Sequence, residues 1–392
     1  MDEEVTRDPH IELVLDEEGF RRLRSLWDEV LFKADHRYPF QSYEWCKAWW
    51  DAFGAGNQLR ILVVFDGPLC LGICPLYLKS VGPFKQLAFL CPDRSDYLDF
   101  IARGGVRDIV IGQVLSYLAS RADDWDLFVL NNICWSDKER EFFLAAAKKN
   151  GLKVASRAYT KSPYVHINMT WDEYLAATGK KKRVRKKERR ILRGGDIEVV
   201  HFKGSENDKC GPAENLFEEA KSIERRTWKY IEGNPRLQGD CKTEQFFQDV
   251  FKSFMKRGWL DLWFALVGGT PRAYAFSFVF DNKVFAYNSG YDNSFSRYRL
   301  GSLLLINRIR DAFENKLEEY DFLRGEEEYK FEWTNNTRRI NEYVLFNRRI
   351  SSAVGARILV KMKWSLARSA LLKNLRYKIK TFLSRRGMHS RE

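Results

Sequence analysis

Residues 289–308 read SGYDNSFSRYRLGSLLLINR, and this segment decides the fold of the second half of the chain. The residues before it, 283–288, have the apolar and aromatic character of a strand, and an apolar helix begins at Arg299–Ser302. Backbone N–H groups at a helix start lack partners within the helix, and the helix dipole adds partial positive charge. With Arg297 beside it, this helix start is either a pyrophosphate cradle or an ordinary helix N-cap.

A second informative stretch is YDFLRGEEEYKFEW at residues 320–333. A short apolar strand runs into Gly325 and is followed by three carboxylates, a phenol and an ammonium group. Acids and proton donors at the end of a strand can supply a general base and a general acid for the acylation of an amine. The alternative is a solvated acidic turn without a chemical role.

Two similar strand–turn–strand patterns indicate an internal duplication. The pattern at residues 59–78 resembles the one at 260–280, and residues 125–129 resemble 320–324 at a nearly equal offset. An apolar helix lies between hairpin and later strand in both halves, so each half has the order hairpin, helix, strand. We therefore expect a mixed α/β protein with two similar domains, each a mixed sheet flanked by helices. The predicted domains are 1–165, 166–350 and a basic tail at 351–392. One amphipathic helix is predicted at Trp171–Leu192, starting at a capping box.

The formal net charge of +13 is concentrated in two segments. Ten Lys and Arg lie between Lys180 and Arg193 with one acidic residue, and eleven lie between Ser351 and Glu392 with one acidic residue. Phosphate-bearing partners or an anionic membrane surface are typical for such segments. The tail is predicted to be a basic amphipathic helix that either lies on anionic lipid or packs on the second domain.

Composition also bears on location and on metal binding. Seven cysteines lack the spacing of a disulfide framework or a zinc site, and none of the five histidines has a partner at ligand spacing, so no metal site is expected. The acidic N-terminus has no apolar signal core, and no apolar run is long enough to span a membrane. We expect a cytoplasmic protein, peripheral at the inner membrane if the tail binds lipid.

Several of these motifs together resemble a known family. The chain is similar to GNAT-type N-acyltransferases related to the Fem peptidyltransferases and to proteins of bacterial cellulose and exopolysaccharide biosynthesis. The resemblance covers about residues 40–340. It rests on Gln41-Ser42-x-Glu44-Trp45, the basic segment 180–193, Gly290-Tyr-Asp, Leu300-Gly-Ser-Leu-Leu and Asp321-Phe-x-x-Gly325-x-Glu327-x-Tyr329-Lys330.

The resemblance implies an acyl-CoA donor and roles for particular residues. The pyrophosphate of the donor would lie on the helix start, with the cofactor-binding residues Arg297, Arg299, Leu300, Gly301 and Ser302. The strand 273–280 would diverge from its neighbour, and a backbone N–H of Phe276 or Ser277 would steady the oxyanion. Glu327 would be the base, Tyr329 the acid for the departing thiolate, and Arg324 and Lys330 would position an anionic acceptor or donor. Leu300 stands where relatives often carry Pro or Ser.

The first half lacks the corresponding loop. Residues 97–101, YLDFI, have no glycine and carry acidic residues in place of arginines. This half is therefore expected to have lost cofactor binding and to serve as scaffold or acceptor-binding surface. Asp96 and Tyr97 either line a substrate cleft between the halves or are turn residues.

Three classes of function follow from these features. The first is an acyl-CoA-dependent N-acyltransferase acting on an amine in cell-envelope, exopolysaccharide or lipid biosynthesis. The second is a Fem-like transferase that takes an aminoacyl group from tRNA, with the basic segment 180–193 on the phosphate backbone. The third is a non-catalytic factor of polysaccharide assembly. No long coiled-coil insertion of the Fem type is visible in residues 171–260, which disfavours the second class.

Overall fold

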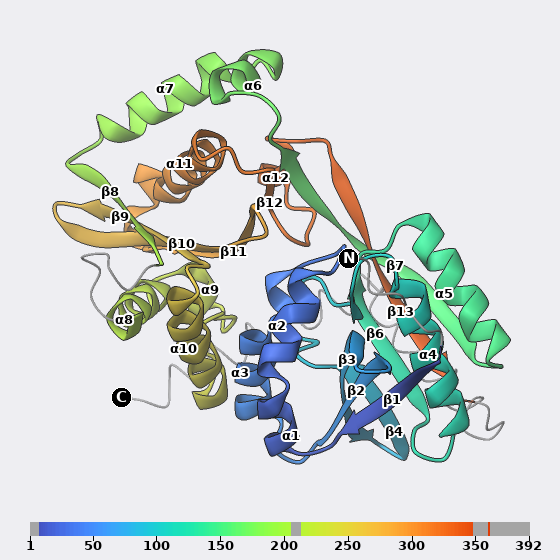
Figure 1. Ribbon diagram of the computed structural model, residues 1–392. Helices are drawn as coiled ribbons and strands as arrows, with labels where there is room; N and C mark the ends of the chain where they lie inside the picture. Colours follow the sequence, from blue (N-terminus) through green and yellow to red (C-terminus); the bar gives the residue numbers. More distant parts are fainter. Residues whose placement is uncertain (1–7, 205–212, 348–359, 361–392) are drawn as a thin grey trace. The chain divides into compact units, whose positions relative to one another are not determined.

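The computed structural model describes residues 8–204, 213–347 and 360 of the 392-residue chain, and these fall into two compact units (Figure 1). Of the described residues, the first unit comprises 8–161, 338–347 and Val360, and the second comprises 162–204 and 213–337. The predicted tail at 351–392 lies outside the described residues apart from Val360. Within the described residues, no helix is long and apolar enough to cross a membrane.

The first unit is a mixed sheet with helices packed on it. Its sheet has the order β1-β2-β3-β4-β6-β13-β7, in which β1 to β4 are antiparallel neighbours and β4 and β6 run parallel. Its elements are β1 (Pro9–Val14), α1 (Glu17–Arg22), α2 (Arg24–Phe32), η1 (Pro39–Gln41), α3 (Tyr43–Phe53), β2 (Gln58–Asp66), β3 (Leu69–Val81), β4 (Phe84–Phe89), β5 (Ile101–Ala102), α4 (Arg107–Ser120), β6 (Leu127–Ile133), α5 (Asp137–Lys149), β7 (Lys153–His166) and β13 (Thr337–Phe346).

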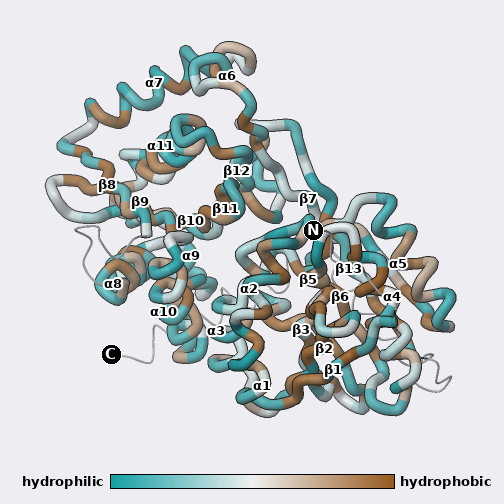
Figure 2. Tube along the Cα trace, viewed as in Figure 1, coloured by the Kyte–Doolittle hydropathy of each residue, from teal (hydrophilic) through white to brown (hydrophobic). Residues whose placement is uncertain are grey.

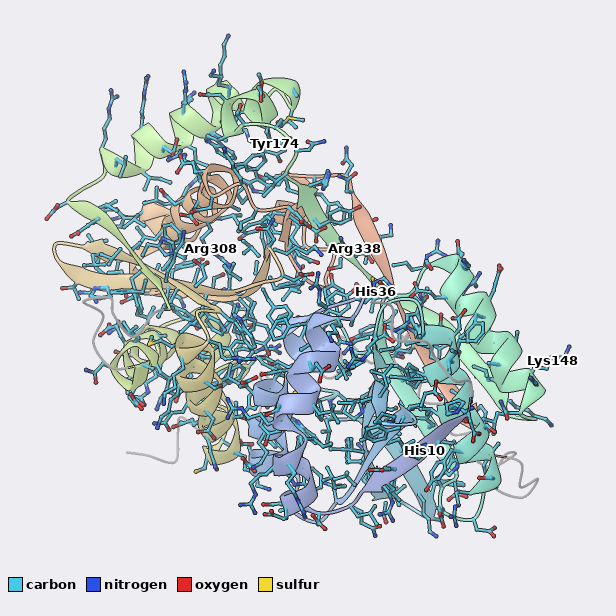
Figure 3. The ribbon with its side chains drawn as sticks, in the orientation of Figure 1. His10, His36, Lys148, Tyr174, Arg308 and Arg338 are labelled. Carbon is cyan, nitrogen blue, oxygen red and sulfur yellow. The ribbon has the colours of Figure 1, made fainter. Side chains whose placement is uncertain are left out.

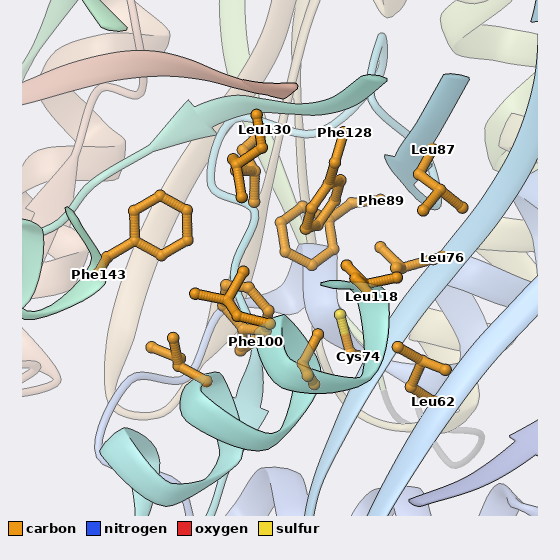
Figure 4. Close-up of a cluster of buried hydrophobic side chains, with 14 of the residues drawn as sticks. Leu62, Cys74, Leu76, Leu87, Phe89, Phe100, Leu118, Phe128, Leu130 and Phe143 are labelled. Carbon is orange, nitrogen blue, oxygen red and sulfur yellow. The ribbon is translucent and has the colours of Figure 1, made fainter. Parts of the chain in front are cut away.

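An apolar core joins this sheet to α4 and α5. Leu62 of β2, Phe89 of β4 and Phe128 of β6 are buried in one cluster with Leu118 of α4 and Phe143 of α5 (Figure 4). Burial of side chains of this size stabilises the folded state by about 1.5–3 kcal/mol each.

The second unit has the same construction. Its sheet has the order β7-β12-β11-β10-β9-β8, with β8 to β11 antiparallel and β11 parallel to β12. Its remaining elements are α6 (Trp171–Ala177), α7 (Lys181–Leu192), β8 (Ile197–Lys203), α8 (Ala213–Glu224), α9 (Trp228–Ile231), α10 (Cys241–Lys256), β9 (Leu260–Val267), β10 (Thr270–Phe280), β11 (Lys283–Tyr291), η2 (Asn293–Tyr298), α11 (Leu300–Glu314), β12 (Glu319–Asp321) and α12 (Glu328–Phe331).

The alternation of side chains along β10 explains why helices cover both faces of this sheet. Phe276 and Phe278 point toward α10, where Phe276 packs against Phe251. Ala273 and Ala275 point to the other face and form a cluster with Leu300 and Leu304 of α11. Large residues on one face and small ones on the other let α11 lie close to the sheet.

The predicted duplication is confirmed, with one exchange of strands. Each unit has four antiparallel strands, a helix (α4 or α11) and a strand parallel to the fourth (β6 or β12). The antiparallel strand beside β6 is β13, from the end of the described chain, whereas the one beside β12 is the end of β7. Each sheet is therefore completed by a strand from the other half of the sequence.

This exchange also moves the domain limits away from the predicted ones. The prediction assigned residues 166–350 to the second domain, but residues 338–347 return to the first unit with β13. Val344 of β13 is buried, pairs with Val129 of β6 and packs with this partly buried side chain. A sequence pattern cannot assign such a strand to one sheet or the other.

The prediction of one helix over Trp171–Leu192 was wrong. Gly179 adopts φ +67, a left-handed conformation that ends α6, and α7 begins at Lys181. The predicted capping box is present, since Thr170 Oγ1 accepts from the backbone N–H of Glu173. Figure 2 shows α7 as mostly hydrophilic with apolar patches, in line with buried Val184 and Ile191 on an otherwise basic helix.

Candidate functional site

The loop between β11 and α11 is held in place by a buried carboxylate. Asp292 caps η2 by accepting from the backbone N–H of Ser294 at 3.0 Å. The same carboxylate forms ion pairs with Arg226, whose Nε lies 3.1 Å away, and with Arg272, whose Nη1 lies 3.3 Å away. Because Asp292 is almost fully buried, these bonds hold the loop in a single shape beside the start of α11.

The start of α11 presents backbone rather than side chains. Arg299, the N-cap residue, lies in the left-handed region at φ 53, and the N–H of Ser302 donates to its carbonyl at 3.0 Å. A Cβ placed on Gly301 would meet only Tyr291, at 3.6 Å, so the backbone there is open on one side. Leu300 is fully buried in the core, which leaves only its backbone for contact with a ligand.

A pocket of about 700 Å³ joins this loop to α7. Six cationic side chains and one carboxylate contribute to its wall, so the pocket has a strongly positive lining. The lining residues are Arg183, Lys186, Lys187, Arg190, Ile191 and Gly194 from α7 and the turn after it, Arg297, Tyr298 and Arg299 from the loop, and Glu332.

Contacts with α11 hold α7 against this loop. Val184 and Ile191 are buried on its inner side, and Glu188 forms an ion pair with Arg310 of α11. In the lining of the pocket, six cationic side chains are opposed by one carboxylate, that of Glu332. Burial, together with Arg183 and Arg299, lowers the pKa of Lys187, while Glu332 opposes this shift. A site of this kind favours an anion that would relieve the crowding of like charges.

Sequence reasoning placed Arg297, Arg299, Gly301 and Ser302 at a phosphate site but did not connect α7 with it. The structure brings Arg297 and Arg299 into the pocket together with Arg183, Lys187 and Arg190. The sequence shows that residues 180–193 are basic, but it does not show that this segment packs on α11 beside the loop.

The acidic loop after β12 is tightly built. Asp321 is buried and accepts from the N–H of Leu323 at 2.6 Å, and Leu323 and Gly325 have φ values of +59 and +120. Lys330 is also buried, and its ammonium donates to the carbonyls of Leu323, Arg324 and Gly325 and pairs with Glu327 at 2.9 Å. These acceptors use its hydrogens, so Lys330 holds the loop, and its predicted contact with a substrate has no support in this geometry. Arg324 is partly buried on the same loop.

The predicted base and acid lie on the outer side of this loop. The side chain of Glu327 is 57% exposed, and Tyr329 is about half exposed. Burial of the phenol and the nearby Glu327 carboxylate raise the pKa of Tyr329 to about 12. The phenol is therefore protonated at neutral pH and can donate a proton.

The diverging strand is β11 rather than the predicted strand 273–280. β10 is paired with β9 and β11 along its length, and Phe276 and Ser277 are fully buried within it. β11 pairs with β12 only from Lys283 to Phe285 and then continues without it, with a register irregularity before Asn288. Ser277 Oγ accepts from Arg308 of α11, which Figure 3 labels between α11 and the sheet. The oxyanion role of a backbone N–H of Phe276 or Ser277 stays a prediction.

Asp96 and Tyr97 do not form a substrate surface in the first unit. Tyr97 is fully buried, with its ring tilted against that of Tyr38 at a centroid distance of 4.7 Å, and Asp96 is almost fully buried. Both residues therefore belong to the interior of the unit.

His201 has partners that its sequence neighbourhood did not reveal. Its Nε2 lies 2.6 Å from Asp261 Oδ1, its Nδ1 lies 3.8 Å from Asp311 Oδ1, and its ring stacks on Trp263. The three residues could ligate a cation, but Lys203 already pairs with Asp311 at 3.2 Å and Trp263 donates to Asp261. The side chains of this cluster, which come from β8, β9 and α11, are therefore bonded to one another and to Lys203 and Trp263.

Residues 179–331 match the family model described as an acetyltransferase (GNAT) domain, and this match includes α7, the loop and α12. The solved structures add similarity over most of the chain at low identity. A conserved protein of unknown function from Bacteroides thetaiotaomicron has a TM-score of 0.56 at 13% identity, covering 86% of this chain and 100% of that one. FemX has a TM-score of 0.59 at 12% identity, covering 82% and 95%.

A third similar structure is the C-terminal domain of a protein described as a lysylphosphatidylglycerol synthetase from Agrobacterium fabrum. Its TM-score is 0.54 at 9% identity, covering 88% of this chain and 96% of that domain. No curated protein matches this chain in sequence. These likenesses concern the fold, and they confirm the tandem mixed α/β architecture expected from the sequence.

Proposed function

We propose, on the premise that residues 179–331 form an acetyltransferase (GNAT) domain, that this protein transfers an acyl group from acyl-CoA to an amine. One observation carries the proposal: the cationic side chains of α7 and those of the loop before α11 line one pocket at a helix start. A helix start and several cations are suited to a compact donor with a pyrophosphate and a further phosphate, as in CoA.

The acidic loop supports the chemistry of amine acylation. Glu327, the exposed N-cap residue of α12, would take a proton from the acceptor amine, and the amine nitrogen would then attack the thioester carbon. When the carbon–sulfur bond breaks, Tyr329, whose phenol is protonated at neutral pH, would give its proton to the thiolate. A carboxylate and a phenol on one short loop are suited to these two transfers.

The acceptor is proposed to be an amine of cell-envelope, exopolysaccharide or lipid biosynthesis. This part of the proposal draws on the resemblance of the motifs and on the fold shared with FemX and with the domain described as part of a lysylphosphatidylglycerol synthetase. An anionic membrane surface is a further proposed partner, through the basic segment from Ser351 onward.

A second candidate donor is an aminoacyl-tRNA, and the solvent face of α7 favours it. Lys182, Arg185 and Arg189 are exposed and lie outside the pocket lining, so the helix offers cations beyond those that a CoA would use. A phosphate backbone lying along α7 would engage both sets, and its binding would weaken steeply with salt.

Thermal unfolding with a set of ligands separates the two donors. A ligand at 100 times its dissociation constant should add about 2.7 kcal/mol to the free energy of unfolding. Acetyl-CoA, longer acyl-CoAs and free CoA should raise the melting temperature, with 3′-dephospho-CoA less effective. A response to aminoacyl-tRNA and to no CoA compound would replace the acyl-CoA donor with the tRNA donor.

A further inference from the structure

Lys229 of α9 lies against the stretch of β11 that has no partner strand. Its Nζ donates to the backbone carbonyl of Ser289 at 3.0 Å and to Asn288 Oδ1 at 3.4 Å. Both residues come after Phe285, the last residue of β11 that pairs with β12. The ammonium group therefore lies beside the part of β11 that has no hydrogen bonds to β12.

The close approach of α9 to β11 depends on a glycine. A Cβ on Gly290 would meet Thr227 Cγ2 at 2.8 Å and Tyr274 Cε1 at 2.7 Å. Thr227 is the N-cap of α9 and accepts from the N–H of Tyr230, so the helix starts directly on the strand. The sequence Ser289-Gly290 thus seats α9 with Lys229 over the neighbouring carbonyl.

Buried hydrogen bonds orient the amide that faces Lys229. Asn288 Nδ2 donates to the hydroxyl of Tyr274 at 3.0 Å, and this hydroxyl donates to Glu224 Oε1 at 3.2 Å. Glu224 is fully buried and also accepts from the backbone N–H groups of Arg236 and Leu237. Because the amide nitrogen of Asn288 is engaged in this way, its oxygen is turned toward Lys229.

The ammonium group keeps one hydrogen for a ligand. Two of its three hydrogens go to Ser289 and Asn288, and no carboxylate within the described part of the chain forms an ion pair with it. Burial lowers the pKa of Lys229, Glu224 and Glu327 act against this shift, and Arg236 adds to it. Glu327, the candidate base, therefore acts on the charge of Lys229, although within the described residues the two form no ion pair.

We propose that Lys229 is a catalytic residue that donates its remaining N–H to the carbonyl oxygen of the acyl group. This inference rests on the proposed acyl transfer. As the amine nitrogen bonds to the thioester carbon, the π electrons of the carbonyl move to oxygen, and Lys229 stabilises that oxyanion. Collapse of the tetrahedral intermediate restores the carbonyl and breaks the carbon–sulfur bond. Glu327 takes the proton of the amine, Tyr329 gives a proton to the thiolate, and Lys229 stays charged throughout. Removing one donor of this kind typically lowers turnover by roughly 10²-fold or more.

Infrared difference spectra of bound acetyl-CoA test the contact without knowledge of the acceptor. With carbon-13 at the thioester carbonyl, a hydrogen bond from an ammonium lowers the carbonyl stretching frequency of the bound donor relative to the free one. The wild-type protein and Lys229→Arg should show the lowered frequency, and Lys229→Met should not. Lys252→Met, which removes an exposed lysine from α10, is the matched control and should behave as wild type.

The outcomes separate this inference from the proposed donor. Calorimetry that detects no acetyl-CoA binding by the wild-type protein would overturn both. Binding with an unchanged carbonyl frequency in Lys229→Met, or equal thiol release by wild type and Lys229→Met, would overturn the role of Lys229 alone. If Lys229→Met does not fold, Lys229→Leu, which also lacks a hydrogen-bond donor, and Lys229→Arg serve instead, and equal carbonyl frequencies in these two variants would contradict the proposal.

The pH profile gives a readout that a structural lysine would not move. The donated N–H requires a charged Lys229, and the lowered pKa means that rising pH removes this charge earlier than for an ordinary lysine. Thiol release should therefore fall on the alkaline side for the wild type, and Lys229→Arg should shift that fall to higher pH. An identical alkaline limb in both proteins would count against the proposal.

Discussion

Arg183 of α7 and Glu332, directly after α12, form an ion pair with Nη2 and Oε2 2.5 Å apart. Glu332 is the one carboxylate in the described lining of the cationic pocket, and it neutralises one of the six cationic side chains there. An incoming phosphate would compete with Glu332 for Arg183. The pair therefore sets part of the affinity of the pocket for anions.

Replacing Glu332 by Gln should strengthen donor binding. The change frees Arg183 and removes the opposing charge, and exposed pairs of this kind contribute about 0.2–1 kcal/mol. We expect a roughly two- to fivefold lower dissociation constant for CoA at low salt, measured by calorimetry. Glu328→Gln, an exposed change outside the pocket lining, is the control; weaker binding by Glu332→Gln would contradict the competition.

Replacing Arg299 by Gly should separate charge from backbone shape. Glycine adopts the left-handed conformation of Arg299 without strain, so the melting temperature should be kept or raised slightly. Loss of a charged donor to phosphate should raise the dissociation constant of CoA about tenfold or more. Unchanged affinity would mean that the loop is only a helix cap.

Gly301 offers a paired test of the same helix start. Alanine fits there, since its Cβ would meet only Tyr291 at 3.6 Å, so Gly301→Ala should fold with wild-type stability. Gly301→Glu places a carboxylate against the phosphates and should abolish CoA binding while the circular dichroism spectrum stays unchanged. Retained affinity in folded Gly301→Glu would remove the donor from this loop.

Glu327→Gln should lower turnover by about 10²-fold with donor affinity little changed, because the amide cannot accept the proton of the amine. Thiol release from acetyl-CoA with a panel of primary amines is the measurement. Glu326→Gln, next to it on the same loop, is the matched control. Equal pH profiles for wild type and Glu327→Gln would exclude Glu327 as the base.

Stability in the first unit should depend on pH through His36. Its Nε2 lies 2.9 Å from Glu139, and this carboxylate raises the pKa of His36 against the effects of burial and Arg107, while the pKa of Glu139 is lowered to about 2. A raised pKa in the folded state means that the stabilisation is present below the ordinary value of about 6.5 and is lost as the pH rises through the folded value. His36→Gln should therefore cost roughly 1 kcal/mol or less at pH 5.5 and nothing at pH 9. Equal losses at both values, by chemical denaturation, would contradict this account.

The sequence predicted the repeated order of strands and helices because that order depends on local patterns. Val64 facing Gly72 in one hairpin and Phe264 facing Tyr274 in the other follow from alternating apolar residues between turns. The exchange of β7 and β13 was not predictable, since Val344 and Val165 suit either sheet equally well. The break at Gly179 was missed because the basic and apolar spacing continues through it.

The candidate site divides in the same way. Glu327, Tyr329 and Arg299 carry recognisable chemistry in short motifs, so the sequence alone proposes them as candidates. The buried position of Lys330, and the place of Lys187 in the pocket, depend on contacts between residues far apart in sequence. Lys229 has no motif around it, and only its hydrogen bond to Ser289 draws attention to it.

The exchange of final strands has a consequence for biosynthesis. The first unit lacks β13 until Phe346 has been synthesised, so β6 has an open edge while nearly the whole second unit emerges from the ribosome. An unpaired strand edge can associate with other chains, and domains elsewhere usually fold in turn from the N-terminus. Here the sheet of the first-made half is completed only after the second half has been synthesised.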